Sequence, residues 1–190
     1  MKKLSCLLLV ALVLAGCSAQ PADHDATSSQ DKHSQVTTKQ VSPSTIKVSV
    51  KQAVAKYHDQ FGAKATVSEL SLERENGRYQ YEVSGLDQRH EYELTLNAQT
   101  GHVIRHEQEL LDTDGDDLTQ TALDVTRLKP LATVSKAAEK RVGGGTAVEW
   151  SMDHENGTVL WEVKVKHGHQ VSEVQVDAYT GKVVRVADDD

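Results

Sequence analysis

The sequence predicts an α+β fold built from two tandem repeats, each with one helix packed on a three- to four-stranded antiparallel sheet. Matching pairs recur at one constant spacing: Asn76-Gly77 with Asn156-Gly157, and Thr100-Gly101 with Thr180-Gly181. Each repeat also contains one stretch with helical apolar spacing, followed by stretches that alternate apolar and polar residues. Self-similarity of this kind indicates a duplicated small domain rather than one large domain.

Residues 1–16 have the pattern of a secretory signal peptide. Two lysines precede an apolar run from Leu4 to Leu14, which is shorter than the roughly 20 residues of a membrane-spanning helix. The run ends in Leu14-Ala15-Gly16-Cys17, which resembles the lipobox of bacterial lipoproteins. The resemblance implies cleavage before Cys17 and attachment of a diacylglyceryl group to its sulfur. The alternative is an ordinary signal peptide cut near Ala19.

Residues 17–46 are expected to form a disordered tether. Ser, Thr, Gln and Asp dominate this stretch, and such a composition cannot offset the entropy cost of ordering the chain. A flexible segment of this length has a root-mean-square reach of about 30 Å. Leader and tether together predict a lipid-anchored protein on the extracytoplasmic side of a cell membrane.

The first repeat, residues 47–109, is expected to begin with a helix. An apolar helical stripe runs from Val50 to Phe61. Ser49 and the glutamine three residues later form a capping-box pattern, and Gly62 is a natural stop. Alternating strand patterns follow, with an Asn-Gly hairpin turn between the first two, and a short last strand is expected at Val103-Ile104.

The second repeat, residues 131–190, follows an acidic linker at 110–130. Thr133 is expected to cap its helix, and Gly143-Gly144-Gly145 to end it. The strand patterns of the first repeat then recur. Because each repeat offers only a small core, the two copies are candidates for packing on each other.

Composition excludes several classes of function. The chain carries a formal net charge of −7, which argues against a general nucleic-acid binder, because such a protein needs a basic face. Both cysteines, Cys6 and Cys17, lie in or next to the leader. The folded part therefore has no thiol for a disulfide framework, a cysteine nucleophile or a cysteine-ligated metal.

The order of elements and the residues at the turns resemble the PepSY domain, named for peptidase propeptides and a spore-cortex protein. The first repeat carries this pattern in Glu75-Asn76-Gly77, Tyr81-Glu82-Val83 and Asn97-Ala98-Gln99-Thr100-Gly101-His102-Val103. The second carries it in Glu155-Asn156-Gly157, Trp161-Glu162-Val163 and Asp177-Ala178-Tyr179-Thr180-Gly181-Lys182-Val183. In the first repeat Asn97 stands where Asp is common in the family.

The resemblance implies a non-enzymatic module that inhibits or regulates peptidases at the cell envelope. The family occurs in propeptides of thermolysin-like metallopeptidases and in secreted or membrane-anchored bacterial proteins. We therefore expect an envelope or secreted peptidase as partner, with no cofactor and no nucleic acid. The alternative is a ligand- or cation-binding sensory or scaffold module of the envelope.

Four residues are candidates for binding a partner. Glu82 and Glu162 recur at equivalent positions, each between two inward-facing residues of a strand, so both are expected on the solvated face of a sheet. His167 and His169 flank a glycine in an expected turn. Two imidazoles alone do not make a specific metal site, which needs three or four ligands.

One acidic stretch partly matches a calcium loop. Asp112, Asp114 and Asp116 occupy alternate positions, as the first three ligands of an EF-hand do. The loop then requires Gly at its sixth position and Glu at its twelfth. This chain has Asp117 and Leu123 there, so we expect a solvated acidic linker rather than a resident metal.

Overall fold

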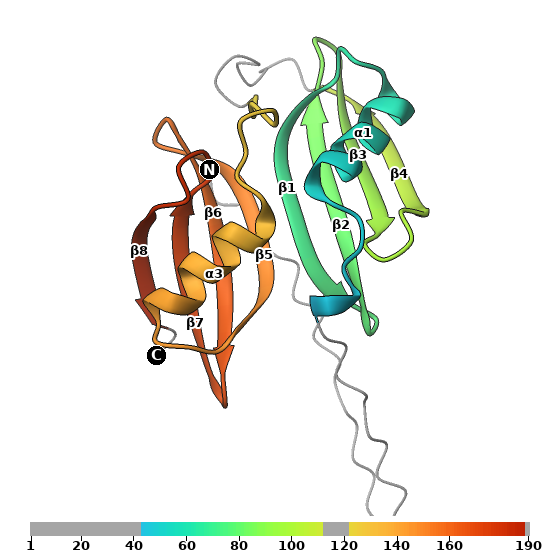
Figure 1. Ribbon diagram of the computed structural model, residues 1–190. Coiled ribbons are helices and arrows are strands. Elements are labelled where there is room, and N and C mark those ends of the chain that lie inside the picture. The colour runs from blue at the N-terminus through green and yellow to red at the C-terminus, as the bar shows by residue number, and fades with distance from the viewer. Residues whose placement is uncertain (1–42, 112–121, 189–190) are drawn as a thin grey trace, which may run out of the picture. The chain divides into compact units, whose positions relative to one another are not determined.

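The computed structural model describes residues 43–111 and 122–188. Cys17 and the calcium candidates Asp112, Asp114 and Asp116 lie outside these ranges. Each repeat has one helix and four antiparallel strands (Figure 1), which confirms the predicted α+β fold class and resolves the number of strands. No helix within the described ranges combines the length and apolar character needed to cross a membrane.

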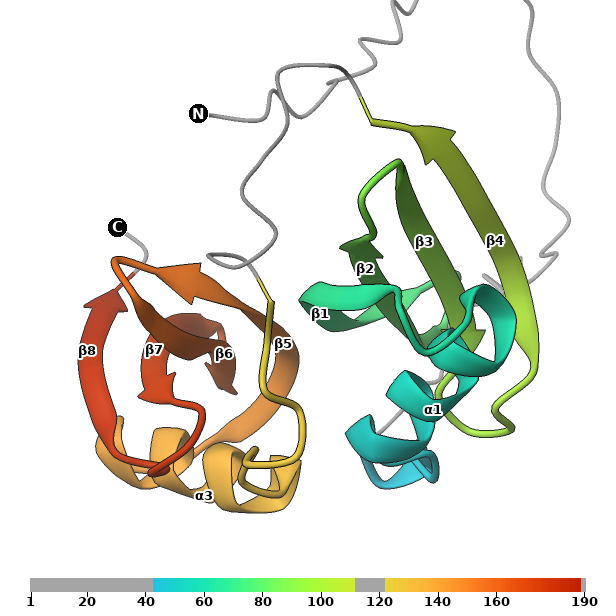
Figure 2. The same ribbon diagram turned by 90° about the horizontal axis from the view of Figure 1, so that it is seen from above.

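The first helix, α1 (Val50–Phe61), has the predicted caps. The Ser49 hydroxyl accepts a hydrogen bond from the Gln52 N–H at 3.3 Å, and the Gln52 side-chain oxygen accepts one from the Ser49 N–H at 2.8 Å. Gly62, with φ 93°, ends the helix and donates its N–H to the His58 carbonyl. Helix α1 lies across one face of the strands that follow (Figure 2), and Ala53, Val54 and Tyr57 of its apolar stripe are buried.

Those strands form an antiparallel meander. They are β1 (Thr66–Glu75), β2 (Arg78–Leu86), β3 (His90–Asn97) and β4 (Val103–Leu110). Asn76 and Gly77 join β1 to β2 with φ 49° and 77°, the conformation that a two-residue type I′ turn requires. The short strand expected at Val103-Ile104 is longer than predicted. Its later residues are charged and exposed, so they show no apolar alternation.

The second repeat contains α3 (Leu131–Arg141), β5 (Thr146–Glu155), β6 (Thr158–His167), β7 (Gln170–Asp177) and β8 (Val183–Asp188). The predicted cap at Thr133 is wrong. Pro130, with φ −56° and ψ 140°, takes the N-cap position, and the Thr133 N–H donates to its carbonyl at 2.8 Å. The proline ring holds φ at about −60°, and with ψ 140° Pro130 lies outside the helical region. The helix therefore begins at the next residue.

The two repeats join in one eight-stranded sheet with the order β4-β3-β2-β1-β5-β6-β7-β8. The joint is an antiparallel pairing of β1 with β5: Leu70 with Met152, Ser71 with Ser151, and Leu72 with Trp150. Leu70 and Trp150 are equivalent positions in the two repeats, as are Leu72 and Met152. The pairing is therefore isologous, with a local two-fold axis at the Ser71–Ser151 pair.

One continuous core lies under both helices. Leu70 and Met152 are directly opposite each other and both are buried, so α1 and α3 cover the same face of the sheet. The Tyr79 and Trp150 rings bridge the joint with centroids 6.0 Å apart. Part of the expected linker also packs here, because Leu123 is buried and donates its N–H to the Val67 carbonyl at 2.7 Å.

Two tyrosine hydroxyls fasten α1 and its leading segment to the sheet. Tyr57 donates to the Thr66 carbonyl at 3.1 Å, and Tyr81 donates to the Val48 carbonyl at 2.9 Å. The first contact depends on Gly85. A Cβ atom there would lie 1.7 Å from the Thr66 oxygen and 2.7 Å from the Tyr57 hydroxyl, so only glycine fits beneath the tyrosine.

Candidate partner-binding surface

The face of the sheet opposite the helices is the open face, and Glu82 and Glu162 both lie on it. Strand register places them in one row that crosses every strand. From β4 to β8 the row reads Arg105, Thr95, Glu82, Ser71, Ser151, Glu162, Gln175 and Arg185. The row is symmetric about the local two-fold axis. Three strand spacings of about 4.8 Å separate the two glutamates, roughly 14 Å between backbones.

Further carboxylates surround the centre of this row. Glu69 and Glu73 lie two residues to either side of Ser71, and Glu149 and Asp153 lie in the same way about Ser151, so all four share the open face. Basic side chains offset only part of this charge. Lys164 bridges Glu149 at 3.0 Å, and Arg105 pairs with Glu93 and Glu107. The open face is therefore acidic at its centre.

The pKa values of the two glutamates are raised mainly by partial burial and further by neighbouring carboxylates. Partial burial, followed by the charge of Glu173, raises the pKa of Glu162 to about 7. Burial also raises the pKa of Glu82, with a smaller contribution from Glu93 and an opposing one from Arg105. In each case a carboxylate on the neighbouring strand adds to the effect of burial.

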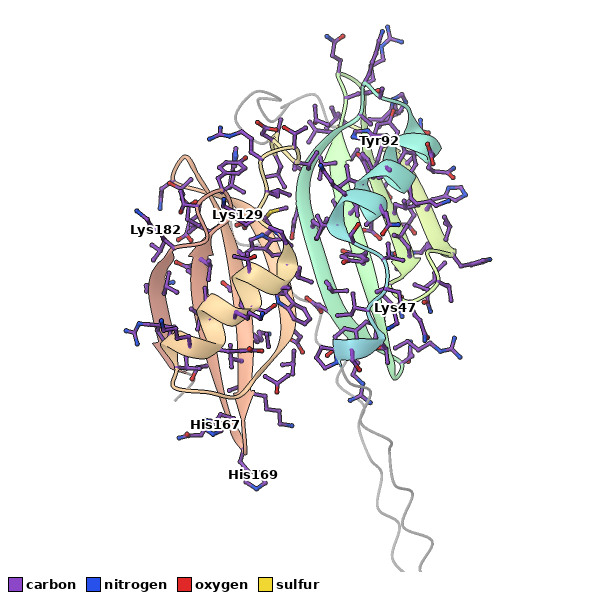
Figure 3. The ribbon with its side chains drawn as sticks, in the orientation of Figure 1. Lys47, Tyr92, Lys129, His167, His169 and Lys182 are labelled. Atoms are coloured by element: carbon purple, nitrogen blue, oxygen red, sulfur yellow. The ribbon has the colours of Figure 1, made fainter. Side chains whose placement is uncertain are left out.

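His167 and His169 lie at the far end of the β6–β7 hairpin, where His169 points away from the body of its repeat (Figure 3) and His167 lies beside the loop of Gly144 and Gly145. Both side chains are exposed, and Gly168, with φ 65°, supplies the turn between them. The structure does not bring them to Glu82 or Glu162. Within residues 43–111 and 122–188, no three His, Cys, Asp or Glu side chains gather closely enough to hold a metal ion.

The equivalent turn of the first repeat, between β2 and β3, is held by one carboxylate. Asp87 accepts hydrogen bonds from the N–H groups of Arg89 and His90 at 2.7 and 2.9 Å, and from the Tyr92 hydroxyl at 2.8 Å. The Arg89 bond is the main reason that the pKa of Asp87 lies below its ordinary value. The hydrogen bonds to Asp87 therefore hold this turn in place. In the His-Gly-His turn, glycine supplies the positive φ that the backbone needs.

Among the strands of residues 43–111 and 122–188, β4 is an edge of the sheet and pairs only with β3. The Leu111 N–H donates to the Arg89 carbonyl. Alternation along the ladder then directs the N–H groups of Glu109 and Glu107 toward β3 and those of Gln108 and His106 outward. Two large apolar side chains are exposed on this strand, Ile104 at 52% and Leu110 at 76%. Backbone and side chains both leave this edge open to another strand.

Comparison with known families agrees with this architecture. The family model described as "Peptidase propeptide and YPEB domain", PepSY, matches residues 47–107 and again residues 129–187. The chain belongs to the PepSY family. The two matched segments coincide with the two helix-and-sheet repeats, so the duplication seen in the sequence is a duplication of the PepSY domain.

A solved structure shares this two-domain fold. It is the crystal structure of a "putative lipoprotein" from Clostridium difficile 630, with 24% sequence identity and a TM-score of 0.70. The similarity covers 80% of this chain and 98% of that chain. No curated protein matches the chain. At this level of identity the likeness establishes the fold alone.

Sequence reasoning placed Glu82 and Glu162 on a solvated face but missed two features of that surface. It did not foresee that the glutamates share one row, because the β1–β5 register is set by contacts between repeats. It also missed the length of the β4 edge, since an exposed strand rich in charge has no apolar period. The polar-apolar alternation around Ser71 and Ser151 indicated which face these residues share, but not the register that forms the row.

Replacing Glu162 by Gln tests the cost of holding a partly buried carboxylate beside Glu173. A carboxyl whose pKa is raised in the folded state favours folding below its unfolded pKa, and that contribution is lost as the pH rises through the folded pKa. We expect Glu162→Gln to stabilise the protein at pH 8 by about 1 kcal/mol, a value reduced for solvent screening. The gain should shrink as the pH falls from about 7 toward 4.5.

Urea unfolding at several pH values measures this difference. Glu109→Gln, on the exposed edge strand, is the control that removes the same formal charge elsewhere in the sheet. A Glu162→Gln difference that stays constant from pH 4.5 to 8 would contradict the account.

Proposed function

We propose that the chain is a membrane-anchored, non-enzymatic PepSY lipoprotein that binds an envelope or secreted peptidase and inhibits or regulates it. The observation that carries the proposal is the open β4 edge beside an acidic face, in a fold whose family description includes peptidase propeptides. An added strand supplies main-chain hydrogen bonds, and the pockets beside it select side chains.

The two surfaces serve different parts of such a complex. The β4 edge pairs with an extended segment at the rim of the peptidase cleft and blocks the cleft without presenting a scissile segment. The acidic open face attracts a basic region of the partner, which raises the association rate more than the final affinity. Arg105, Glu107 and Glu109 on β4 discourage pairing with strands of the wrong charge pattern.

The anchor rests on the lipobox-like Leu14-Ala15-Gly16-Cys17. The description of the structurally similar Clostridium difficile protein supports it. Replacing Cys17 by Ser removes the sulfur that would carry the lipid. We expect the parent protein to sediment with membranes and to incorporate labelled palmitate, and the Cys17→Ser variant to do neither.

An unlabelled parent would overturn the anchor while leaving the peptidase proposal intact. Cys6→Ser is the matched control, because Cys6 lies inside the expected leader and its loss should leave labelling unchanged.

The peptidase proposal is tested by capture followed by inhibition. The Cys17→Ser chain is immobilised, exposed to envelope and secreted proteins of the producing cells, and the retained proteins are identified by mass spectrometry. We expect a peptidase whose activity falls with increasing amounts of the chain. The Gln108→Pro variant should bind it at least about tenfold more weakly, because proline cannot donate the outward hydrogen bond.

Gln108→Ala is the control for this variant, since it removes the side chain and keeps the N–H, and it should bind as the parent does. Capture of only cell-wall or transport components would contradict the peptidase proposal. Equal binding by Gln108→Pro and Gln108→Ala would contradict strand addition at β4.

A further inference from the structure

A groove lies on the helix side of the sheet, between the segments that lead into α1 and α3. It encloses about 640 Å³, a volume within the range of ligand sites. The first repeat contributes residues 43, 46–51 and 81, and the second contributes residues 125, 128–132, 135 and 150. The groove therefore exists only because β1 and β5 pair.

The inner surface of the groove is apolar and fixed in place. Ile46, Val48, Val125 and Leu128 line it together with the Trp150 ring. The Trp150 indole N–H donates to the Ser135 hydroxyl at 3.0 Å, and that hydroxyl donates to the Leu131 carbonyl at 2.9 Å. The polar groups beneath the ring are thus satisfied within the protein, and the surface left for a ligand is hydrophobic.

The charged side chains of the groove all have one sign. Lys47, Lys51 and Lys129 line it, and no Asp or Glu of the part of the chain that the structure describes does. Among residues 43–111 and 122–188, none of these three lysines forms an ion pair. The acidic residue nearest to Lys129 in the sequence is Asp124. Its carboxylate accepts hydrogen bonds from the Thr126 hydroxyl and N–H instead. In a chain of net charge −7, this groove is a local positive site.

The two helix starts reinforce that sign. Neither α1 nor α3 has an acidic residue in its first turn, although the positive end of a helix dipole favours one. Lys47 and Lys129 occupy matching places, since each donates its N–H to the alanine carbonyl at the end of a core strand, Ala98 or Ala178, at 2.9 Å. Figure 3 labels both lysines.

From this charge complementarity we infer that the groove binds an extended acidic segment of a protein partner, with an apolar side chain on the Trp150 side and carboxylates at the lysines. The lysines stand on both repeats, so the segment crosses the joint and contacts both PepSY domains. This site lies on the opposite side of the sheet from the acidic open face, and it does not depend on the peptidase proposal.

Fluorescence anisotropy with a defined peptide tests the inference. The probe is a short fluorescein-labelled peptide of repeating Glu-Leu-Thr units, and its counterpart has Lys in place of Glu. The protein is the full chain with Cys17→Ser. We expect saturable binding of the Glu peptide, a shift of the protein's tryptophan emission, and no binding of the Lys peptide.

Charge reversal locates the binding. Lys47→Glu together with Lys129→Glu should weaken binding by about tenfold or more. Lys182, labelled in Figure 3, does not line the groove, so Lys182→Glu reverses a charge elsewhere and should leave affinity within about twofold. Circular dichroism establishes that each variant folds, and Lys129→Arg, which keeps the charge, should retain binding.

Three results would overturn the inference. One is the absence of saturable binding by the Glu peptide to the folded parent. Another is an equal loss with Lys182→Glu, which would mean general attraction rather than a site. The third is saturable binding to phosphatidylglycerol vesicles without binding to the peptide, which would assign the groove to lipid.

Discussion

The pairing of β1 with β5 at the Ser71–Ser151 pair is the constraint on which the rest of the molecule depends. It converts two small domains into one eight-stranded sheet with one core, so each repeat covers an apolar edge that it could not bury alone. It also places Glu82 and Glu162 in one row on the open face and brings the two helix starts together around the groove. Both proposed binding surfaces are products of this joint.

The symmetry at the joint is broken where each repeat packs its own helix. In the first repeat Tyr57 reaches over Gly85 to the Thr66 carbonyl, whereas Val165 fills the place of that glycine in the second. Tyr81 donates to the Val48 carbonyl, but the equivalent Trp161 is fully buried, and its indole N–H has no partner within the described residues. A buried N–H of this kind costs stability, which indicates that the second core is held mainly by apolar packing.

The sequence was sufficient to predict most of the local structure, with the start of α3 and the length of β4 as exceptions. The Ser49–Gln52 cap, the Asn-Gly turns and the strand alternation all follow from chemistry between neighbours in the chain, and the structure contains each of them. The cap at Thr133 failed because Pro130 imposed an earlier start. The groove and the row through Glu82 and Glu162 could not be foreseen, since both require the register between β1 and β5. No residue in either strand specifies that register without the partner strand.

The most direct test of the central claim is a nuclear Overhauser measurement in solution across the joint. The account predicts backbone cross-strand contacts between Leu70–Leu72 and Trp150–Met152, with the contact of Ser71 to Ser151 at their centre. Amide protons at the joint should also exchange as slowly as those in the interior of the sheet. If these contacts are absent and the β1 and β5 amides exchange as rapidly as those of the β4 edge, the repeats are separate domains, and the shared row and groove do not exist.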